Sequence, residues 1–445
     1  MFNWLFARHH GGVFVLRVED TDLERSTKEF ETSILEGMRW LGMDWDEGPY
    51  YQTRRMDLYR EHVQKLLDEG KAYRCTCSPE ELEKKRSEAM ADGRKPKYDG
   101  TCREGPKHPD RPAVVRFRCP DSGTTVFHDI CRGTVTWDNA EMDDLIIARS
   151  DGSPTYNFTV VVDDVTMGIT HVIRGDDHIN NTPRQVQLYG ALGYPVPEFA
   201  HLPMIHGQDK KKLSKRHGAT SVIEYEKMGY LPDAMVNYLA RLGWAHGDQE
   251  IFTREELVEK FDLSVVGSSP SVFDFEKLGW VNAQHLAKLS DERIAELVAP
   301  FWAELGIESR DAGYAAAAIA TVRVRGDTLK KLAEASAFYF RESVDIDPKA
   351  AGKWLSNECV DRLKKIRLSI AEAPEMSEAS LTKIFEDLAA ELGLKMTDLA
   401  QPVRVAMTGG TASPGIYEVL SVLGRERVLA RLDAAIAGGG LNGGK

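Results

Sequence analysis

The chain contains 445 residues, of which 42% are hydrophobic, so it can bury several hydrophobic cores and we expect two to four domains. Its formal net charge of -12 argues against indiscriminate binding of nucleic acid, although a basic face can coexist with an acidic remainder. Six cysteines in so long a chain do not indicate a disulfide scaffold, and no apolar run is as long as a membrane span. With no visible signal peptide, a cytoplasmic protein without a membrane partner is the expectation.

The amino-terminal segment predicts a helix, a strand and two further helices. Residues 2–8 have a helical pattern that ends at Gly11 and Gly12. The segment VFVLRVED (13–20) predicts a short buried strand with charged residues at its carboxyl end, where open α/β sheets bind their ligands. The helices predicted next cover residues 29–41 and 54–70.

Three cysteines follow at a spacing typical of a metal site. Cys75 and Cys77 lie two residues apart, and Cys102 comes 25 residues later, across a charged helix predicted over 79–91. This spacing suits one structural, tetrahedral zinc ion, which would need a fourth ligand. A small hairpin of reduced cysteines without metal is the other interpretation.

The middle of the chain predicts mainly strands. Alternating apolar residues between 113 and 137 indicate antiparallel strands. The segment DDLIIARSDGSPTYNFTVVVDD (143–164) predicts long apolar strands around a Gly-Ser-Pro turn, and HVIRGDD (171–177) predicts another strand end. Thr182 is expected to cap the next helix, because a proline directly follows it.

The carboxyl-terminal half predicts helices. The segment 232–242 begins with proline and has a helical apolar face. From about 293 to the end, nearly all of the apolar periodicity is helical, and no pairs of strands are indicated.

The strongest concentration of charge is the loop DKKKLSKRHG (209–218). Blocks of like charge are usually only solvated surface. Mobile lysines can also neutralise the charge that develops when pyrophosphate leaves a triphosphate. The five cations of this loop are Lys210, Lys211, Lys212, Lys215 and Arg216.

The segment HLPMIHGQDKKKLSKRHGA resembles the KMSKS loop of class I aminoacyl-tRNA synthetases, and the bacterial glutamyl-tRNA synthetases fit best. The segments LRVEDTD, SPTYNF, HVIRGDD and FDFEKLGWVNAQHL are similar to family motifs in the same order, and the resemblance runs through all 445 residues. It implies an α/β fold in which a Rossmann-type parallel sheet carries an inserted α+β acceptor-stem module. An all-helical anticodon-binding region is implied at the carboxyl end. The implied segments are 1–70 and 151–205 for the two halves of the Rossmann fold, 71–150 for the inserted module, 206–292 for the KMSKS loop and stem-contact domain, and 293–445 for the anticodon-binding domain.

The resemblance implies a site for glutamate at the strand ends. Glu19 matches the acceptor of the substrate ammonium, and Arg174 matches the arginine that pairs with a glutamate carboxylate. The alternative for Arg174 is an internal ion pair with Asp176 or Asp177. Tyr156 matches a tyrosine whose hydroxyl lies in the substrate pocket, and the alternative for it is a purely structural role in the core. The implied substrate-binding residues are Arg17, Glu19, Tyr156 and Arg174.

The same resemblance implies the chemistry. Lys212 and Lys215 are the expected catalytic residues, and together with Ser214 they would bind ATP. The glutamate carboxylate attacks the α-phosphate, with Mg²⁺ beside the phosphates, and the terminal ribose hydroxyl of tRNA(Glu) then attacks the adenylate. The expected partners are therefore L-glutamate, ATP and tRNA(Glu), and the family is usually monomeric.

This chain departs from the family pattern at three places. Many bacterial relatives have a histidine two residues after the third cysteine, where this chain has Glu104; Tyr98 is the other candidate for a fourth zinc ligand, because a tyrosine at that place binds zinc in some relatives. Val160 stands where some relatives have an amide. The HIGH motif is absent, and we interpret the pair His9-His10 as a helix cap rather than a substitute.

Without the first strand and the HIGH motif, the ATP site lacks donors for phosphate. We therefore expect the chain that starts at Met1 to be a poor or inactive enzyme. A catalytically inactive tRNA-binding paralogue or fragment is the alternative to an active glutamate–tRNA ligase. Glutaminyl enzymes fit less well, since their anticodon region is a pair of β-barrels.

Overall fold

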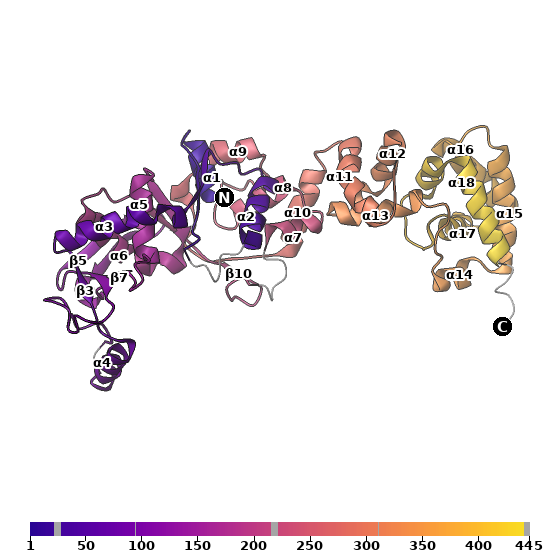
Figure 1. The fold of residues 1–445 in the computed structure, drawn as a ribbon. Coiled ribbons are helices and arrows are strands. Elements are labelled where there is room, and N and C mark those ends of the chain that lie inside the picture. Colours follow the sequence, from indigo (N-terminus) through magenta and orange to yellow (C-terminus); the bar gives the residue numbers. More distant parts are fainter. Residues whose placement is uncertain (22–27, 94, 215–220, 310, 440–445) are drawn as a thin grey trace. The chain divides into compact units, whose positions relative to one another are not determined.

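The computed structural model describes residues 1–21, 28–93, 95–214, 221–309 and 311–439. The chain forms two compact units (Figure 1). The first unit comprises Met1–Ile223 and Met235–Asp274, and the second comprises Glu224–Ala234 and Phe275–Lys445.

The first unit contains the strands. Its helices are α1 (Phe2–His9), α2 (Lys28–Trp40), α3 (Met56–Asp68), α4 (Pro79–Ala91), α5 (Tyr156–Thr166), α6 (Thr182–Leu192) and α9 (Arg254–Lys260). Its strands are β1 (Val15–Val18), β2 (Glu47–Tyr51), β3 (Ala72–Cys75), β4 (Val114–Phe117), β5 (Thr124–Asp129), β6 (Gly133–Asp138), β7 (Ile146–Ala148), β8 (His171–Gly175), β9 (Glu198–Leu202), β10 (Ile205–His206) and β11 (Ser271–Val272). Helices α7 (Val222–Lys227) and α8 (Pro232–Arg241) contain the points where the chain passes between the units.

Parallel pairing confirms the expected α/β character of this unit. Strands β1 and β2, β8 and β9, β5 and β9, and β10 and β11 pair in parallel. The largest sheet has the order β6-β5-β9-β8, in which only β5 and β6 are antiparallel. The register between β8 and β9 places Arg174 directly opposite His201. Because parallel strands end at one edge of a sheet, the polar ends of β8, β9 and β5 lie close together.

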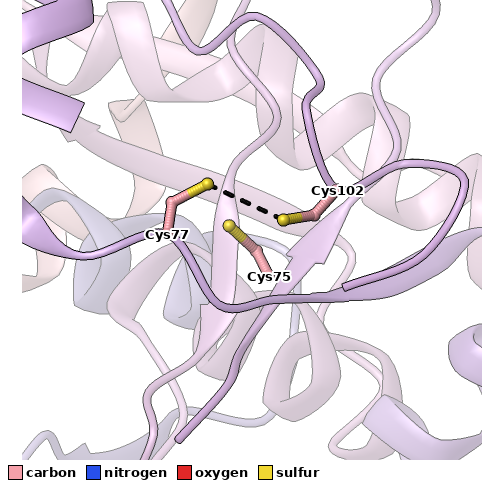
Figure 2. Close-up of side chains that lie close together, drawn as sticks. All are labelled: Cys75, Cys77 and Cys102. Atoms are coloured by element: carbon pink, nitrogen blue, oxygen red, sulfur yellow. Dashed lines mark hydrogen bonds between the residues drawn. The ribbon is translucent and has the colours of Figure 1, made fainter. Parts of the chain in front are cut away.

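The cysteine-rich segment folds around a second, antiparallel sheet of order β3-β4-β7. Helix α4 covers the predicted residues 79–91 and begins with a capping box, in which Ser78 accepts from the backbone N–H of Glu81 and the Glu81 carboxylate accepts from that of Ser78. The loop after α4 returns Cys102 to the end of β3, and the three cysteine side chains point toward one another (Figure 2).

One secondary-structure prediction is wrong. The second half of 143–164, expected to be a strand, is helix α5. Its central residues, 158–164, are all buried, so it has no polar face that would reveal a helical period. A short apolar run rich in valine is consistent with either a buried strand or a buried helix, and tertiary packing decides between them.

A second prediction is displaced by one residue. Asn181 occupies the N-cap of α6, and Thr182 is the first residue inside the helix. The Thr182 hydroxyl makes no capping bond and instead accepts a hydrogen bond from Arg174. Thr182, which the sequence predicts to cap helix α6, therefore binds Arg174 at the end of strand β8 instead.

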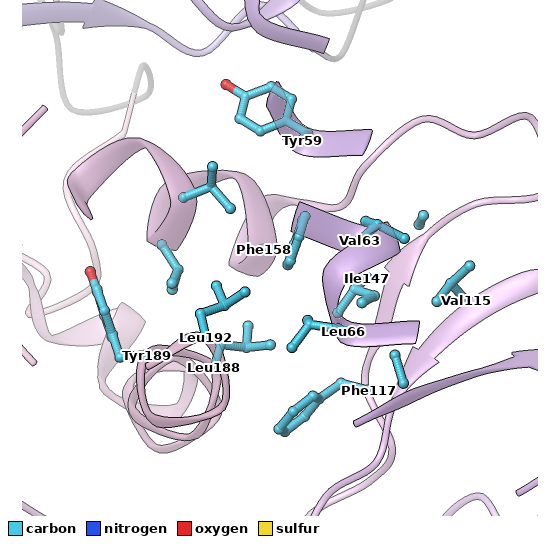
Figure 3. Packing of buried hydrophobic residues seen from close by; sticks show 14 of the residues in the cluster. Tyr59, Val63, Leu66, Val115, Phe117, Ile147, Phe158, Leu188, Tyr189 and Leu192 are labelled. Atoms are coloured by element: carbon cyan, nitrogen blue, oxygen red, sulfur yellow. The ribbon is translucent and has the colours of Figure 1, made fainter. Parts of the chain in front are cut away.

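The main core of the first unit lies between α3, α5, α6 and the sheets (Figure 3). Leu66 from α3, Phe158 and Val161 from α5, and Leu188 from α6 are fully buried there. Packing on helices α3 and α6 and on strand β7 fixes the position of α5.

The second unit is helical in its described residues, as predicted. Its helices are α10 (Phe275–Leu286), α11 (Asp291–Glu304), α12 (Ala312–Val322), α13 (Leu329–Ser336), α14 (Pro348–Trp354), α15 (Asn357–Glu372), α16 (Glu378–Leu392), α17 (Met396–Thr408) and α18 (Ile416–Gly439). Among the helices that the structure describes, none combines the length and the apolar composition needed to cross a bilayer.

Replacing Val161 by alanine tests the buried helix α5. Val161 is fully buried, so V161A should lower the free energy of unfolding by about 2 kcal/mol through lost burial and a residual cavity. The control residue is Val196, in the loop before β9, which is 44% exposed. V196A should change the free energy of unfolding by less than about 0.5 kcal/mol. Urea unfolding followed by circular dichroism measures both variants. Equal effects would contradict the assigned packing.

Candidate active site

Arg174, at the carboxyl end of β8, is a half-buried cation held by neutral groups. Its Nε donates to Nε2 of His201 at 3.2 Å. One terminal nitrogen donates to Oγ1 of Thr182 at 2.9 Å and to Oε1 of Gln185 at 2.7 Å. The guanidinium also lies 5.9 Å from the centre of the Phe199 ring. Three neutral acceptors and one ring therefore fix the plane of the guanidinium.

The ion pair considered as an alternative for Arg174 is not formed. Asp176 accepts from Arg132 at 2.7 Å, and Asp177 accepts from Lys212 at 3.0 Å. In the described part of the chain, no carboxylate contacts the Arg174 guanidinium. Burial lowers the pKa of Arg174, which means that the site disfavours its charge when no anion is present. This arrangement suits an arginine whose counter-ion is a ligand.

Arg17 and Glu19 lie together at the end of β1. One terminal nitrogen of Arg17 donates to Oδ1 of Asp164 at 2.8 Å, and the other donates to Oε1 of Glu19 at 3.3 Å. The Arg17 Nε lies 3.6 Å from a carboxylate oxygen of Asp163. Both acids belong to α5, so Arg17 connects the strand end to that helix and orients the exposed carboxylate of Glu19.

Tyr156 lies at the start of α5, between the charges of the strand ends. Its hydroxyl is 3.3 Å from Nδ1 of His178. Burial raises the pKa of Tyr156, the charge of Glu19 raises it further, and the charge of Arg174 opposes the rise. The structure thus brings Glu19, Tyr156 and Arg174 within electrostatic range of one another. Val160, one helical turn after Tyr156, is buried.

Beneath these residues lies a buried acid that the sequence analysis did not identify. Asp163 is fully buried and accepts hydrogen bonds from Arg55, Gln52 and Tyr59 at 2.8 to 2.9 Å. With so many donors, the carboxylate is well paired despite its burial. Asp163 therefore holds the segment after β2 and the start of α3 against α5.

The part of the basic loop that the structure describes forms a tight hairpin with β10. The N–H of Leu213 donates to the carbonyl oxygen of Ile205 at 2.9 Å. Lys212 is more than half exposed and pairs with Asp177, at the end of β8. Ser214 is half-buried, whereas the expected catalytic residue Lys215 lies outside the described residues.

A cavity of about 500 Å³ lies between the ends of β8 and β9 and the basic loop. Arg174 and Lys212 contribute its positive charge, and Leu202, Pro203 and Met204 form an apolar wall. A cavity with an apolar wall and a few fixed charges can bind a ligand that has a flat ring and anionic groups.

The three cysteines form a compact cluster of thiols, as their spacing predicts. The sulfur atoms of Cys75, Cys77 and Cys102 lie within 4.8 Å of one another, and that of Cys77 is 3.7 Å from that of Cys102 (Figure 2). Burial opposes ionisation of Cys102, but backbone N–H groups of Lys107 and Thr76 outweigh it and lower its pKa to about 6. Burial raises the pKa of Cys77 to about 11. Three converging thiols are a donor set that zinc prefers.

Tyr98 and Glu104, the two candidates for a fourth ligand, lie in different places. The Tyr98 hydroxyl is 3.3 Å from the sulfur of Cys75 and 3.8 Å from that of Cys77. The Glu104 side chain is 91% exposed and pairs with Arg118 at 3.2 Å. The structure therefore brings Tyr98 to the thiols and does not bring Glu104 to them.

A second cavity, of about 410 Å³, lies in the helical unit, between the end of α13 and the loop after α17. Arg325 and Arg341 are among its lining residues. Arg325 and Arg404 both donate to the carbonyl oxygen of Ser413, which orders that loop. Glu334 and Asp345 also line the cavity, so its lining carries charges of both signs.

Sequence reasoning missed the residues that support Arg174. His201, Thr182 and Gln185 come from β9 and α6, and each is buried. Their residue types are common, and no motif spacing distinguishes them from structural residues. The pairing of β8 with β9 reveals the role of His201, and the hydrogen bonds from Arg174 reveal the roles of Thr182 and Gln185.

Comparison with known proteins agrees with both units. Residues 1–280 match the family of class I tRNA synthetases (E and Q), catalytic domain, and residues 293–436 match an anticodon binding domain. The chain is 55% identical to a glutamate–tRNA ligase of Syntrophobacter fumaroxidans, over 98% of this chain and 93% of that protein. It is 54% identical to a glutamate–tRNA ligase of Geobacter sulfurreducens, over 98% of this chain and 94% of that protein. A crystal structure of a glutamate tRNA ligase from Elizabethkingia meningosepticum, in complex with its amino acid, matches with a TM-score of 0.88 and 31% identity, covering 98% and 95% of the two chains. The chain therefore belongs to the glutamate–tRNA ligase family of class I aminoacyl-tRNA synthetases.

Proposed function

We propose that this chain activates L-glutamate with ATP and transfers it to the 3' end of tRNA(Glu). The single observation that carries the proposal is Arg174, a half-buried guanidinium whose direct partners are all neutral. A permanently charged group in this setting gains most from an anionic ligand, and a guanidinium can hold a carboxylate through two parallel hydrogen bonds.

Glutamate carries two carboxylates, and only one of them reacts. The α-carboxylate becomes the acyl group of the adenylate, whereas the side-chain carboxylate keeps its charge in both steps. We assign the side-chain carboxylate to Arg174, with the Tyr156 hydroxyl beside it. The exposed carboxylate of Glu19, oriented by Arg17, would bind the substrate ammonium.

The cavity beside Arg174 is the proposed site for ATP. The apolar wall of residues 202–204 would pack on the adenine ring, and Lys212 would approach the phosphates together with Ser214 and Lys215. The substrate α-carboxylate attacks the α-phosphate, and pyrophosphate leaves with its charge neutralised by the lysines. Mg²⁺ bound to the phosphates would supply further neutralisation. In the second step, a terminal ribose hydroxyl of the tRNA attacks the adenylate carbonyl and AMP leaves.

We assign tRNA binding to the helical region from 293 onward, where the anticodon-binding match lies. The cavity lined by Arg325 and Arg341, together with Glu334 and Asp345, would admit an unstacked base, and its two arginines suit the adjoining phosphates. Bases in single-stranded loops are the parts of RNA that proteins read most readily.

We also propose one structural zinc ion, held by Cys75, Cys77, Cys102 and Tyr98. The support is the convergence of three sulfur atoms and a phenol oxygen at the end of β3. Zinc would close the loop after α4 onto β3, and it would take no part in the reaction.

The carboxylate assignment is tested with R174K, which keeps the charge but loses the planar, two-pronged contact. The sequence alone predicts a poor or inactive enzyme, but the similarity to glutamate–tRNA ligases leads us to expect that the wild-type chain catalyses ATP–pyrophosphate exchange that depends on glutamate and tRNA(Glu). In R174K, kcat/KM for glutamate should fall about a hundredfold. The control R60K changes an exposed arginine of α3 and should leave exchange unaltered. Normal glutamate kinetics in R174K would contradict the assignment. A wild-type chain that binds tRNA(Glu) without exchange would favour the inactive tRNA-binding alternative.

The zinc site is tested by metal analysis of the purified protein. About one zinc per chain is expected, and C102S should lose it, since each thiolate is a required ligand. Y98F should bind zinc more weakly, whereas E104Q should retain it. The control C131S removes a half-buried thiol outside the cluster. A wild-type protein without bound metal would rule out the site, and metal loss in E104Q alone would reverse the choice of fourth ligand.

The proposed role in tRNA binding of the cavity lined by Arg325 and Arg341 is tested with R341Q. Removing this charge from the cavity should weaken binding of tRNA(Glu) about tenfold at fixed salt, as measured by fluorescence anisotropy. The control R293Q removes the same charge from an exposed position on α11 and should weaken binding less than about twofold. Equal losses in both variants would show a general charge effect instead of a specific pocket.

A further inference from the structure

We infer that His201 and Asp129 are positioning residues for Arg174, and that His201 serves as a neutral hydrogen-bond acceptor that fixes the guanidinium for its carboxylate. The inference rests on the carboxylate-binding role proposed for Arg174. His201 and Asp129 are fully buried, on β9 and at the end of β5. Neither residue lines the cavity beside Arg174.

Both ring nitrogens of His201 have partners. Nδ1 lies 2.6 Å from Oδ2 of Asp129. Nε2 lies 3.2 Å from Nε of Arg174 and 3.1 Å from Oγ1 of Thr182. The parallel register of β8 and β9 sets the contact with Arg174, because these two residues are directly paired.

The chemistry of these partners assigns the protons. The Arg174 Nε–H group can only donate, so Nε2 of His201 must accept, and the ring proton must lie on Nδ1. Asp129 accepts that proton's hydrogen bond. The Thr182 hydroxyl accepts from Arg174, and its own hydrogen shares the single lone pair of Nε2 with the Arg174 Nε–H group. A doubly protonated ring would instead direct its Nε2–H group at the Arg174 Nε–H group and place two cations side by side.

Asp129 is itself held in place as an anion. Its Oδ1 accepts from the backbone N–H groups of Cys131 at 3.0 Å and Arg132 at 2.9 Å, in the turn between β5 and β6. Burial raises the pKa of Asp129, but the hydrogen bonds from His201 and from the backbone outweigh that effect and lower it. The charged groups around the ring are therefore Asp129 and Arg174, with Arg132 bonded to the His201 carbonyl oxygen.

The imidazole thus separates a buried carboxylate from a half-buried guanidinium. A carboxylate in direct contact with Arg174 would occupy the donors that the substrate needs, and no counter-charge at all would make the partly desolvated cation costly. Asp129 acts through the neutral ring, so Arg174 is oriented and partly compensated while its outer face stays available for a carboxylate.

The tautomer is tested by ¹⁵N NMR of histidine-labelled protein at neutral pH, with the His201 signals assigned by their loss in H201N. Nδ1 should carry the proton and Nε2 should have the shift of an unprotonated nitrogen. A protonated Nε2 would overturn the inference. This measurement needs no enzymatic turnover, so it decides the tautomer even if the proposed function fails.

The positioning role is tested with two amides of different reach. H201Q places an amide oxygen near the position of Nε2 and can still accept from Arg174, whereas the shorter H201N reaches Asp129 only. H201N should raise the glutamate KM in ATP–pyrophosphate exchange at least about tenfold, and H201Q less than about threefold. In both variants kcat and the ATP KM should change less than about twofold. D129N, which permits the opposite tautomer, should resemble H201N.

The matched control is His62, a buried histidine of α3 whose ring nitrogens contact the Leu58 carbonyl and the Tyr194 hydroxyl. H62N should leave the glutamate KM unchanged. Equal effects of H201N and H201Q, or an equal rise in the ATP KM, would indicate a structural role only and overturn the inference. Absence of exchange in the wild-type chain would instead refute the proposed function, with the NMR result left to decide the tautomer.

Discussion

The candidate site of the first unit depends on the partial burial of one cation, Arg174, without a carboxylate in contact. A partly desolvated guanidinium needs acceptors in several directions, and those at Arg174 come from two elements of the fold. Strand β9 provides His201, and the first two turns of α6 provide Thr182 and Gln185. Gln185 in turn donates to Asn157 at the start of α5. The pairing of β8 with β9 and the packing of α5 on α6 are therefore conditions for the site as well as for the core.

Candidate residues that would face a ligand are easier to propose from the sequence than the residues that support them. Glu19, Tyr156 and Arg174 lie in short motifs at strand and helix ends, where spacing and residue type are informative. His201 begins the segment that resembles the KMSKS loop, but its contact with Arg174 depends on a strand register that no local pattern specifies. Helix α5 was mistaken for a strand because it is buried on all sides, which removes the periodicity that normally distinguishes the two structures. Thr182 looked like a helix cap because the rules of capping take no account of a neighbouring arginine.

In the cysteine cluster too, the sequence predicts some of the candidate ligands and the fold places the rest. The spacing of Cys75, Cys77 and Cys102 was enough to predict that the thiols converge, since a short hairpin and a capped helix leave the chain few paths. The neighbouring fourth group could not be chosen from spacing, because Tyr98 and Glu104 are both close to Cys102 in sequence. In the structure Tyr98 accepts a hydrogen bond from the backbone N–H of Cys102, which holds the phenol inward, whereas Arg118 draws Glu104 to the surface.

The contact between Lys212 and Asp177 has a consequence for how ATP would enter. Both side chains are largely in solvent, with exposed fractions of 65% and 43%, so the pair contributes at most about 1 kcal/mol. A triphosphate competes for the same ammonium with several negative charges, so displacing the aspartate lowers nucleotide affinity about fivefold at most. If Lys212 binds ATP as proposed, Asp177 would hold its side chain beside the cavity at little cost in nucleotide affinity. Added salt screens the attraction between Lys212 and the nucleotide, which would weaken nucleotide binding. The same salt weakens the ion pair between Lys212 and Asp177, which the nucleotide must displace, so the two effects would partly cancel.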